Sequence, residues 1–271
     1  MTLKADRRLP PGWVRLLQYL RLVIVGAIVW VALLLLVFGR PVTALAHSET
    51  LPQLAIALYG VGLYAMLLGG AAYLWRKDGG VFAVRFSPAN LAEGWILGLV
   101  GLGLLVAIER GAGWITPRAG AHIDPLGLFT AAIVGMLFAV SEEVLFRGFV
   151  LGLLRRDLAP FGALAASATI FALAHYLHPF DWRTVLLPLA GLWSAGALLA
   201  SCRLRTGSLW LGIGLHASWV WYITASGQQR WWSIHDSLWT GGGSPAAGLL
   251  GPLLLGLTYM WVRRRHRAIV P

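Results

Sequence analysis

Apolar runs long enough to cross a lipid bilayer are the feature that most constrains this chain. A transmembrane helix needs about 20 predominantly apolar residues. Such runs lie near residues 22–39, 53–75, 91–109, 125–154, 160–180, 184–202, 208–226 and 245–262. They predict an all-α, polytopic membrane protein with about eight transmembrane helices, organised as a single transmembrane domain over residues 1–271.

The composition supports this interpretation and excludes an ordinary soluble domain. Only 12% of the residues are charged, against about 25% in a typical soluble globular protein. The mean hydropathy is +0.72. The net charge of +11 would suit a nucleic-acid-binding protein, but in a membrane protein it is more often due to basic cytoplasmic loops. We therefore expect a lipid bilayer as the partner and no nucleic acid.

The distribution of basic residues predicts the orientation. If the N-terminus is cytoplasmic, most of the 22 Lys and Arg residues fall on the cytoplasmic side, as the positive-inside rule requires. The opposite side then receives only Arg40, Arg110, Arg118, Arg183 and Arg230. This arrangement predicts that both termini are cytoplasmic in a multi-pass protein of the cell (plasma or inner) membrane.

Two short features allow an alternative interpretation. Ala44-Leu45-Ala46 follows the first apolar run and could be a signal-peptidase site, although the run is longer than a typical signal core, so we expect the first helix to be retained. The single cysteine, Cys202, excludes an internal disulfide and is interpreted as a small apolar core residue.

Ionisable residues inside the apolar runs are costly and mark a candidate functional site. They are Glu142, Glu143, Arg147, His175 and His216. The fourth and fifth runs form a hairpin near residues 157–160, and Glu142 and His175 each lie about 22–27 Å along their helices from that turn, at about 1.5 Å per residue. His216 lies about 15 Å into its helix from the same side. The three side chains are therefore expected at similar depths.

Helical spacing assigns different tasks to the two glutamates. Glu143 and Arg147 are four residues apart and can pair, whereas Glu142 points about 100° away and can face the other helices. A glutamate that faces a poorly solvated pocket can act as a general base. His175 could share the water that Glu142 deprotonates, and His216 could donate a hydrogen bond to an oxyanion. The alternative is a purely structural Glu–Arg pair with two histidines bonded to backbone carbonyls.

Three motifs on these residues resemble those of a known family. "EEVLFR" (Glu142 to Arg147) resembles a Glu-Glu-x-x-x-Arg motif, and "FALAH" (Phe171 to His175) resembles a Phe-x-x-x-His motif. The segment "RTGSLWLGIGLHASW" (Arg205 to Trp219), which contains His216, resembles the segment around a third motif. The family is the CAAX protease and bacteriocin-processing (CPBP or Abi) family, which includes the type II CAAX prenyl endopeptidases. The resemblance covers about residues 125–222, which we interpret as the protease-family core.

The resemblance implies an intramembrane glutamic endopeptidase, a hydrolase that cleaves a peptide bond of a membrane-associated protein or peptide. Glu142 and His175 then activate a water molecule, and His216 helps to stabilise the oxyanion. Glu143, Arg147 and Phe171 are implied as supporting residues.

This sequence departs from the family's pattern at one position. The third motif usually reads His-x-x-x-Asn, but Val220 occupies the last position here and cannot donate a hydrogen bond. Ser218, a backbone amide or a tryptophan indole are the candidate substitutes.

A zinc-dependent variant of the same protease is the alternative mechanism. Two histidines and a glutamate are acceptable zinc ligands, and they would be Glu142, His175 and His216. His178 adds a further histidine, but no His-Glu-x-x-His motif is present, so we expect no metal and no other cofactor.

Two other functions fit an apolar protein with buried ionisable groups. One is a non-enzymatic membrane immunity or scaffold protein, in which these groups only fix helix packing. The other is a proton-coupled transporter. The sequence does not identify the substrate or distinguish a prenylated C-terminus from a leader peptide or a membrane anchor.

Overall fold

A computed structural model describes residues 11–38, 52–77, 86–175, 182–243 and 247–266. The chain divides into two compact units, residues 1–83 and residues 84–271, which we describe separately. The prediction of one transmembrane domain over the whole chain stays a prediction.

The described residues of the first unit form a pair of long helices, α1 (Gly12–Phe38) and α3 (Pro52–Lys77). They pack against each other, and the Tyr19 hydroxyl of α1 donates a hydrogen bond of 3.1 Å to the Leu67 carbonyl of α3. Glycines permit the close approach, because a side chain at Gly62 would overlap the Trp30 indole. Small residues at helix contacts are typical of packing in membranes.

The second unit is a helical assembly with a short β-ribbon. Its long helices are α4 (Pro88–Gly111), α5 (Pro125–Glu143), α7 (Pro160–His175), α8 (Trp182–Thr206), α9 (Trp210–Gln228) and α11 (Leu250–Arg265). A π-helical segment (Val144–Val150) and the short α6 (Leu151–Leu154) continue α5. The minor elements are β1 (Ile115–Pro117), β2 (Trp232–Ile234), α10 (Ser237–Thr240) and a 3-10 turn (Gly241–Gly243).

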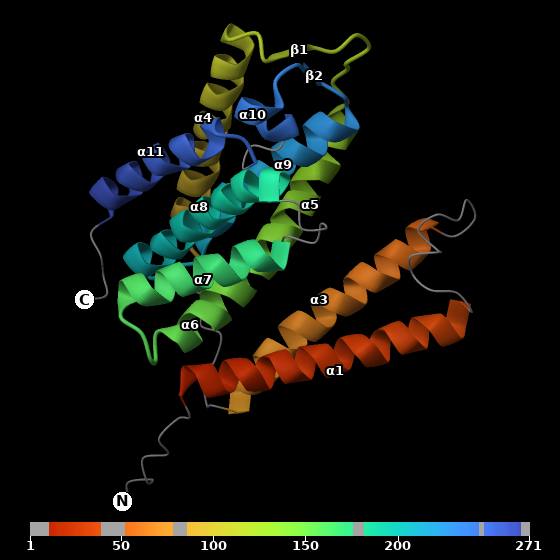
Figure 1. The fold of residues 1–271 in the computed structure, drawn as a ribbon, viewed down its shortest axis with the longest axis vertical. Coiled ribbons are helices and arrows are strands. Elements are labelled where there is room, and N and C mark those ends of the chain that lie inside the picture. Colours follow the sequence, from red (N-terminus) through yellow and green to blue (C-terminus); the bar gives the residue numbers. More distant parts are fainter. Residues whose placement is uncertain (1–10, 39–51, 78–85, 176–181, 244–246, 267–271) are drawn as a thin grey trace, which may run out of the picture. The chain divides into compact units, whose positions relative to one another are not determined.

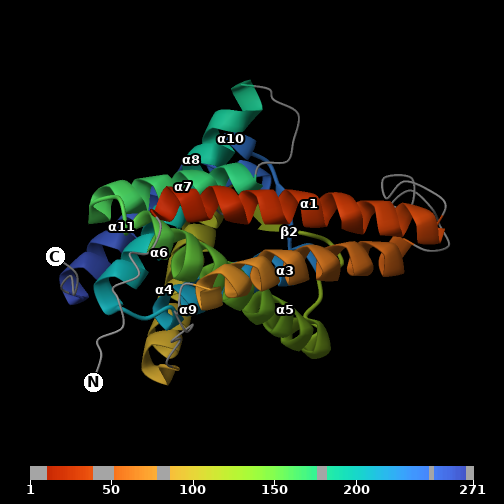
Figure 2. The same cartoon turned by 90° about the horizontal axis from the view of Figure 1, so that it is seen from below.

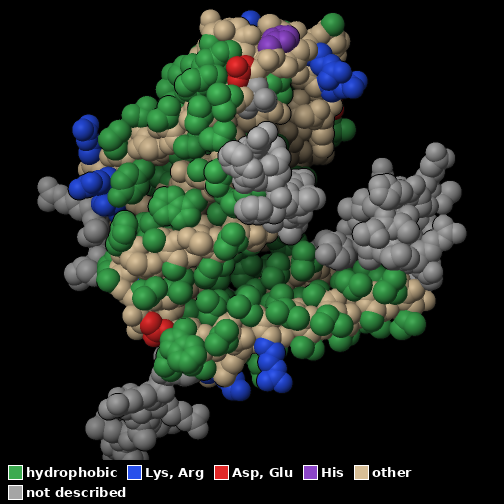
Figure 3. All heavy atoms as spheres, viewed as in Figure 1, with side chains coloured by type: hydrophobic (Ala, Val, Ile, Leu, Met, Phe, Trp, Pro, Cys, Tyr) green, Lys and Arg blue, Asp and Glu red, His purple; other side chains and the backbone are tan. Residues whose placement is uncertain are grey.

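Within the described residues, each apolar run identified in the sequence overlaps one of these long helices or, for 125–154, the continuous segment α5–π–α6. The all-α fold class is therefore confirmed. Four described segments are long and apolar enough to cross a bilayer, namely Gly12–Leu36, Pro88–Gly111, Pro125–Leu154 and Val185–Thr206. Hydrophobic side chains also cover much of the visible surface of these helices (Figure 3). The chain is a membrane protein, while the count of eight spans and the orientation of the termini remain predictions.

Helix α9 lies at the centre of the second unit because glycines let its neighbours approach closely. Its residues from Leu211 to Ser218 are all buried. A side chain at Gly94 of α4 would overlap the Leu211 carbonyl, and one at Gly214 would overlap the Leu91 carbonyl. On the other side, a side chain at Gly135 of α5 would come within 2.7 Å of the Ala217 carbonyl. These contacts clamp α9 between α4 and α5.

A second layer of helices packs beside this core. Helices α7 and α8 run side by side (Figures 1 and 2), and a side chain at Gly196 of α8 would come within 3.1 Å of Ala168 on α7. Helix α11 packs on α8 through a buried cluster that includes Leu198, Cys202 and Val262. Cys202 is thus a buried core residue, as expected.

The β-ribbon was not predicted from the sequence. Strands β1 and β2 pair antiparallel, with Ile115 opposite Ile234, beyond the ends of α4 and α9 (Figure 1). Each strand has three residues, which is too short to produce a recognisable alternation of apolar and polar positions.

The ends of two helices are defined by local sequence signals. Asp124 accepts hydrogen bonds from the Leu126 and Gly127 amides at the start of α5, where Pro125 occupies the first turn. Ser87 caps α4 in the same way. Aspartate or serine followed by proline is a common helix start. The candidate cleavage site at Ala44-Leu45-Ala46 and His178 lie outside the described residues.

Candidate active site

The buried ionisable residues converge at one place in the second unit. Glu142 and Glu143 are the last residues of α5, Arg147 lies in the π-helical segment, His175 ends α7, and His216 lies in the middle of α9. Elements from distant parts of the chain therefore bring the three motifs together.

Glu142 lies between the two histidines. Its Oε2 atom is 3.0 Å from Nε2 of His175 and 3.7 Å from Nε2 of His216. Only 9% of the Glu142 surface is exposed. The expected convergence of these three side chains is confirmed, whereas their catalytic roles remain predictions.

Glu143 and Arg147 form the buried ion pair that their spacing predicted. Arg147 donates from Nη1 to Oε1 of Glu143 at 3.0 Å and from Nη2 to the Gly196 carbonyl of α8 at 3.1 Å. Both side chains are almost completely buried. Because a buried charge is costly unless it is paired and hydrogen-bonded, this pair ties the end of α5 to α8.

A contact between Glu143 and His216 was not predicted from the sequence. Oε1 of Glu143 lies 3.1 Å from Nδ1 of His216. Glu143 is held by Arg147 as a carboxylate, which can only accept, so Nδ1 of His216 carries the proton. Glu143 therefore fixes the orientation of the His216 ring and directs Nε2 towards Glu142. Sequence spacing identifies partners within one helix, but not a partner on a distant one.

Phe171 lies between the charged pair and the catalytic candidate His175. Its ring packs against the Arg147 guanidinium at 4.2 Å and against the His175 ring, with centroids 4.2 Å apart. Its carbonyl accepts a hydrogen bond of 2.8 Å from Nδ1 of His175. Phe171, which the family motif implies as a supporting residue, thus contacts both His175 and Arg147.

The hydrogen bond to Phe171 determines how many protons the Glu142–His175 pair holds. A carbonyl oxygen only accepts, so Nδ1 of His175 is protonated. The contact of 3.0 Å between Nε2 and Oε2 of Glu142 then contains one shared proton. The pair is either imidazolium and carboxylate or neutral imidazole and carboxylic acid. In the first form, Glu142 can accept a proton.

The helix that carries the two glutamates changes its winding directly after them. Residues Val144–Val150 are π-helical, and π-helical segments occur frequently at functional sites. The wider turn includes Arg147 while the Glu143–Arg147 contact is kept. Nothing in the apolar pattern of residues 125–154 indicated this change.

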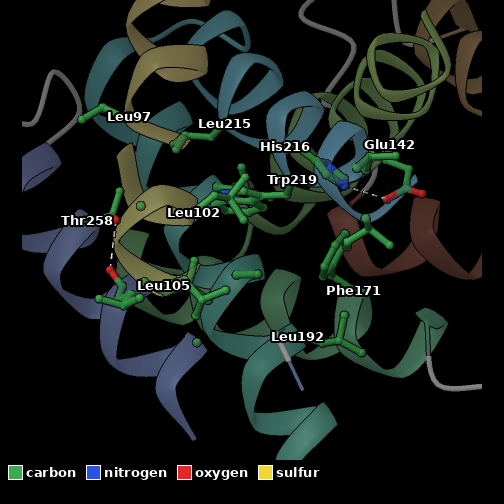
Figure 4. Close-up of a pocket in the computed structure, with 18 of the residues that line it drawn as sticks. Leu97, Leu102, Leu105, Glu142, Phe171, Leu192, Leu215, His216, Trp219 and Thr258 are labelled. Carbon is green, nitrogen blue, oxygen red and sulfur yellow. Dashed lines mark hydrogen bonds and ion pairs between the residues drawn. The ribbon is translucent and has the colours of Figure 1, made fainter. Parts of the chain in front are cut away.

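A cavity of about 250 Å³ opens beside Glu142 (Figure 4). Glu142, His175 and His216 form its polar end, and the remaining wall is mostly apolar. Helices α4, α8, α9 and α11 supply that wall, including Leu102, Leu192, Trp219 and Leu254. A carboxylate and two imidazoles thus meet a space that is lined mostly by apolar side chains.

The structure shows where the side chains lie that could replace the asparagine of the third family motif. Val220 lines the cavity. The buried Ser218 hydroxyl donates to the Leu215 carbonyl at 2.7 Å, and a side chain at Gly98 of α4 would overlap it, so it faces α4. Trp219 lines the cavity, with its ring 6.3 Å from that of His216. Of the two named side chains, Trp219 is therefore the better placed.

The same geometry bears on the metal alternative. No group of three His, Cys, Asp or Glu side chains in the described ranges is arranged to hold a metal ion. Glu142 instead contacts His175 directly. His178, the additional histidine considered as a ligand, lies outside those ranges.

Comparison with known proteins supports the resemblance found in the motifs. Residues 124–222, less than half of the chain, match the family described as type II CAAX prenyl endopeptidase Rce1-like. No curated protein and no solved structure matches the chain. The match covers the three motifs and begins within one residue of the predicted core. Over residues 124–222 the chain is therefore similar to the Rce1-like type II CAAX prenyl endopeptidases.

Proposed function

We propose that the protein is an intramembrane endopeptidase that hydrolyses a peptide bond of a membrane-associated protein or peptide. The observation that carries the proposal is the contact of Glu142 with His175 at 3.0 Å, at the polar end of an otherwise apolar cavity. The similarity of residues 124–222 to the Rce1-like family supports the same reaction class. The protein would act in the cell membrane, with about eight spans and both termini cytoplasmic.

In the proposed reaction, Glu142 and His175 activate one water molecule. Glu142 accepts a proton from the water, and the resulting hydroxide adds to the carbonyl carbon of the peptide bond. The electron pair of the carbonyl moves to its oxygen. Glu142 then passes the proton to the amide nitrogen as the carbon–nitrogen bond breaks, which releases a carboxylic acid and an amine.

His216 would stabilise the negative oxygen formed in this step. Its Nδ1 proton is donated to Glu143, so Nε2 becomes a donor only when the ring is doubly protonated. Removing one such donor from an oxyanion site typically raises the barrier by about 2.7–4 kcal/mol.

Replacing Glu142 by glutamine tests the proposal. The amide is nearly isosteric but cannot accept the proton, and loss of a general base reduces the rate by about 10²–10⁴-fold. Cells with wild type are compared with cells carrying Glu142→Gln by proteomics, and a new terminus should appear only with wild type. Glu93→Gln is the matched control, because Glu93 contacts His266 and does not line the cavity.

Two results would contradict the proposal. Equal peptide termini in both strains would favour a non-enzymatic immunity or scaffold protein, and flux driven by a pH gradient in proteoliposomes without cleavage would favour a transporter. We propose a metal-free mechanism, so a chelator should leave the activity of the purified protein unchanged. Loss of activity with recovery on adding Zn²⁺ would instead indicate the zinc-dependent variant.

A further inference from the structure

We propose that the cavity beside Glu142 is a specificity pocket for one bulky apolar side chain next to the cleaved bond, and that Gly101 of α4 controls how large that side chain can be. This inference rests on the proposed function. It concerns the part of the cavity that α4 and α11 supply, outside residues 124–222.

The ionisable groups of the cavity all lie at one end. Figure 4 shows Glu142 and His216 on one side and Thr258 on the opposite side. The Thr258 hydroxyl donates to the Leu254 carbonyl of its own helix at 3.0 Å, so its proton is not available to a group in the cavity. A polar side chain in this region would lose hydrogen bonds with water and gain few in return, whereas an apolar one would not.

The size of the cavity restricts the occupant. An apolar cavity of about 150 Å³ takes a benzene molecule. By that proportion, the volume of about 250 Å³ accommodates about ten carbon atoms. This is enough for an aromatic side chain or a large aliphatic one.

Gly101 is the point at which the pocket could be made smaller without disturbing the fold. It lines the cavity, and a Cβ atom placed on it meets no atom within 4 Å. A leucine side chain there would enter the space that the substrate group would use. Gly103, two residues further along α4, also has room for a Cβ atom, with no other atom within 4 Å, but it does not line the cavity.

The test compares Gly101→Leu with Gly103→Leu in the purified full-length protein in liposomes. Both variants receive a pool of synthetic peptides with randomised residues on both sides of a central bond, and mass spectrometry identifies the cleaved bonds. Wild type should favour Phe or Leu over Ala at one position beside the cleaved bond. Gly101→Leu should lower the Phe-to-Ala ratio at least tenfold, and Gly103→Leu should leave it unchanged.

A second arm does not depend on cleavage. A peptide carrying a photoreactive leucine is irradiated with the Glu142→Gln protein, and its cross-links should map to α4 and α11 and disappear when Gly101→Leu is added. If no peptide is cleaved, the proposed function fails, yet this arm still decides the pocket. Cross-links that are insensitive to Gly101→Leu would overturn the inference.

Two further outcomes would also overturn it. One is an equal change of the Phe-to-Ala ratio in the Gly101 and Gly103 variants. The other is a preference for S-farnesyl-cysteine over Phe at the same position, because the occupant would then be an isoprenoid chain.

Discussion

Helices α1 and α9 are both apolar, but they face different surroundings. Helix α1 exposes large apolar side chains, with Leu36 81% and Ile28 64% exposed, and it meets the length and hydropathy criteria for a membrane span. Helix α9 buries an unbroken run from Leu211 to Ser218 and is not among the four described segments that meet those criteria. Hydropathy thus identifies the surface that lipid would cover, whereas the helix at the centre of the candidate site is recognised by what it packs against.

The difference has a physical basis. In lipid an apolar side chain gains little from a neighbouring helix, because the acyl chains are equally apolar. In the protein interior, close packing and satisfied polar groups determine stability. Substitutions around α9 should therefore lower the free energy of unfolding, whereas the same substitutions on α1 or on the exposed face of α3 should leave it nearly unchanged.

The largest effect is expected for Arg147→Met. It leaves the buried Glu143 carboxylate without its partner, and breaking a buried ion pair in this way costs about 3–5 kcal/mol. The control is Arg21→Met on an exposed position of α1, expected within about 0.5 kcal/mol of wild type. The free energy of unfolding is measured by denaturant titration in detergent micelles. Equal losses in the two variants would remove the contrast.

A smaller effect is expected for Leu211→Ala. Leu211 is completely buried on α9, and a cavity of this kind costs about 2–5 kcal/mol. Leu36→Ala removes the same atoms from an exposed position of α1 and should change stability by less than about 0.5 kcal/mol. The same titration compares them, and a loss for Leu36→Ala as large as that for Leu211→Ala would show that α1 is covered by protein.

The smallest loss is expected for Gly214→Ala. The added methyl group would overlap the Leu91 carbonyl of α4, and overpacking of this kind costs about 1–3 kcal/mol. Gly69→Ala in α3 meets no atom within 4 Å and should be neutral or slightly stabilising, because alanine favours a helix more than glycine does. Retention of wild-type stability by Gly214→Ala would contradict the packing of α9 against α4.

More of the candidate site than of the detailed fold could be predicted from the sequence. Glu142, His175 and His216 were identified because ionisable side chains are rare in apolar runs, and their proximity followed from helix lengths and one hairpin. The Glu143–Arg147 pair followed from a spacing of four. The Glu143–His216 contact could not be predicted, because the rotation of one helix about its axis relative to another is set by packing.

The sequence by itself determined that the chain is a helical membrane protein and which ionisable residues are candidates for its chemistry, since hydropathy and charge are properties of each residue in its own segment. Only the tertiary structure decided that Glu143 orients His216, that residues 144–150 wind as a π-helix, and that α4 and α11 close a cavity beside Glu142. These features depend on which faces of separate helices meet, and that choice is made by glycines and side-chain volumes acting across the whole core.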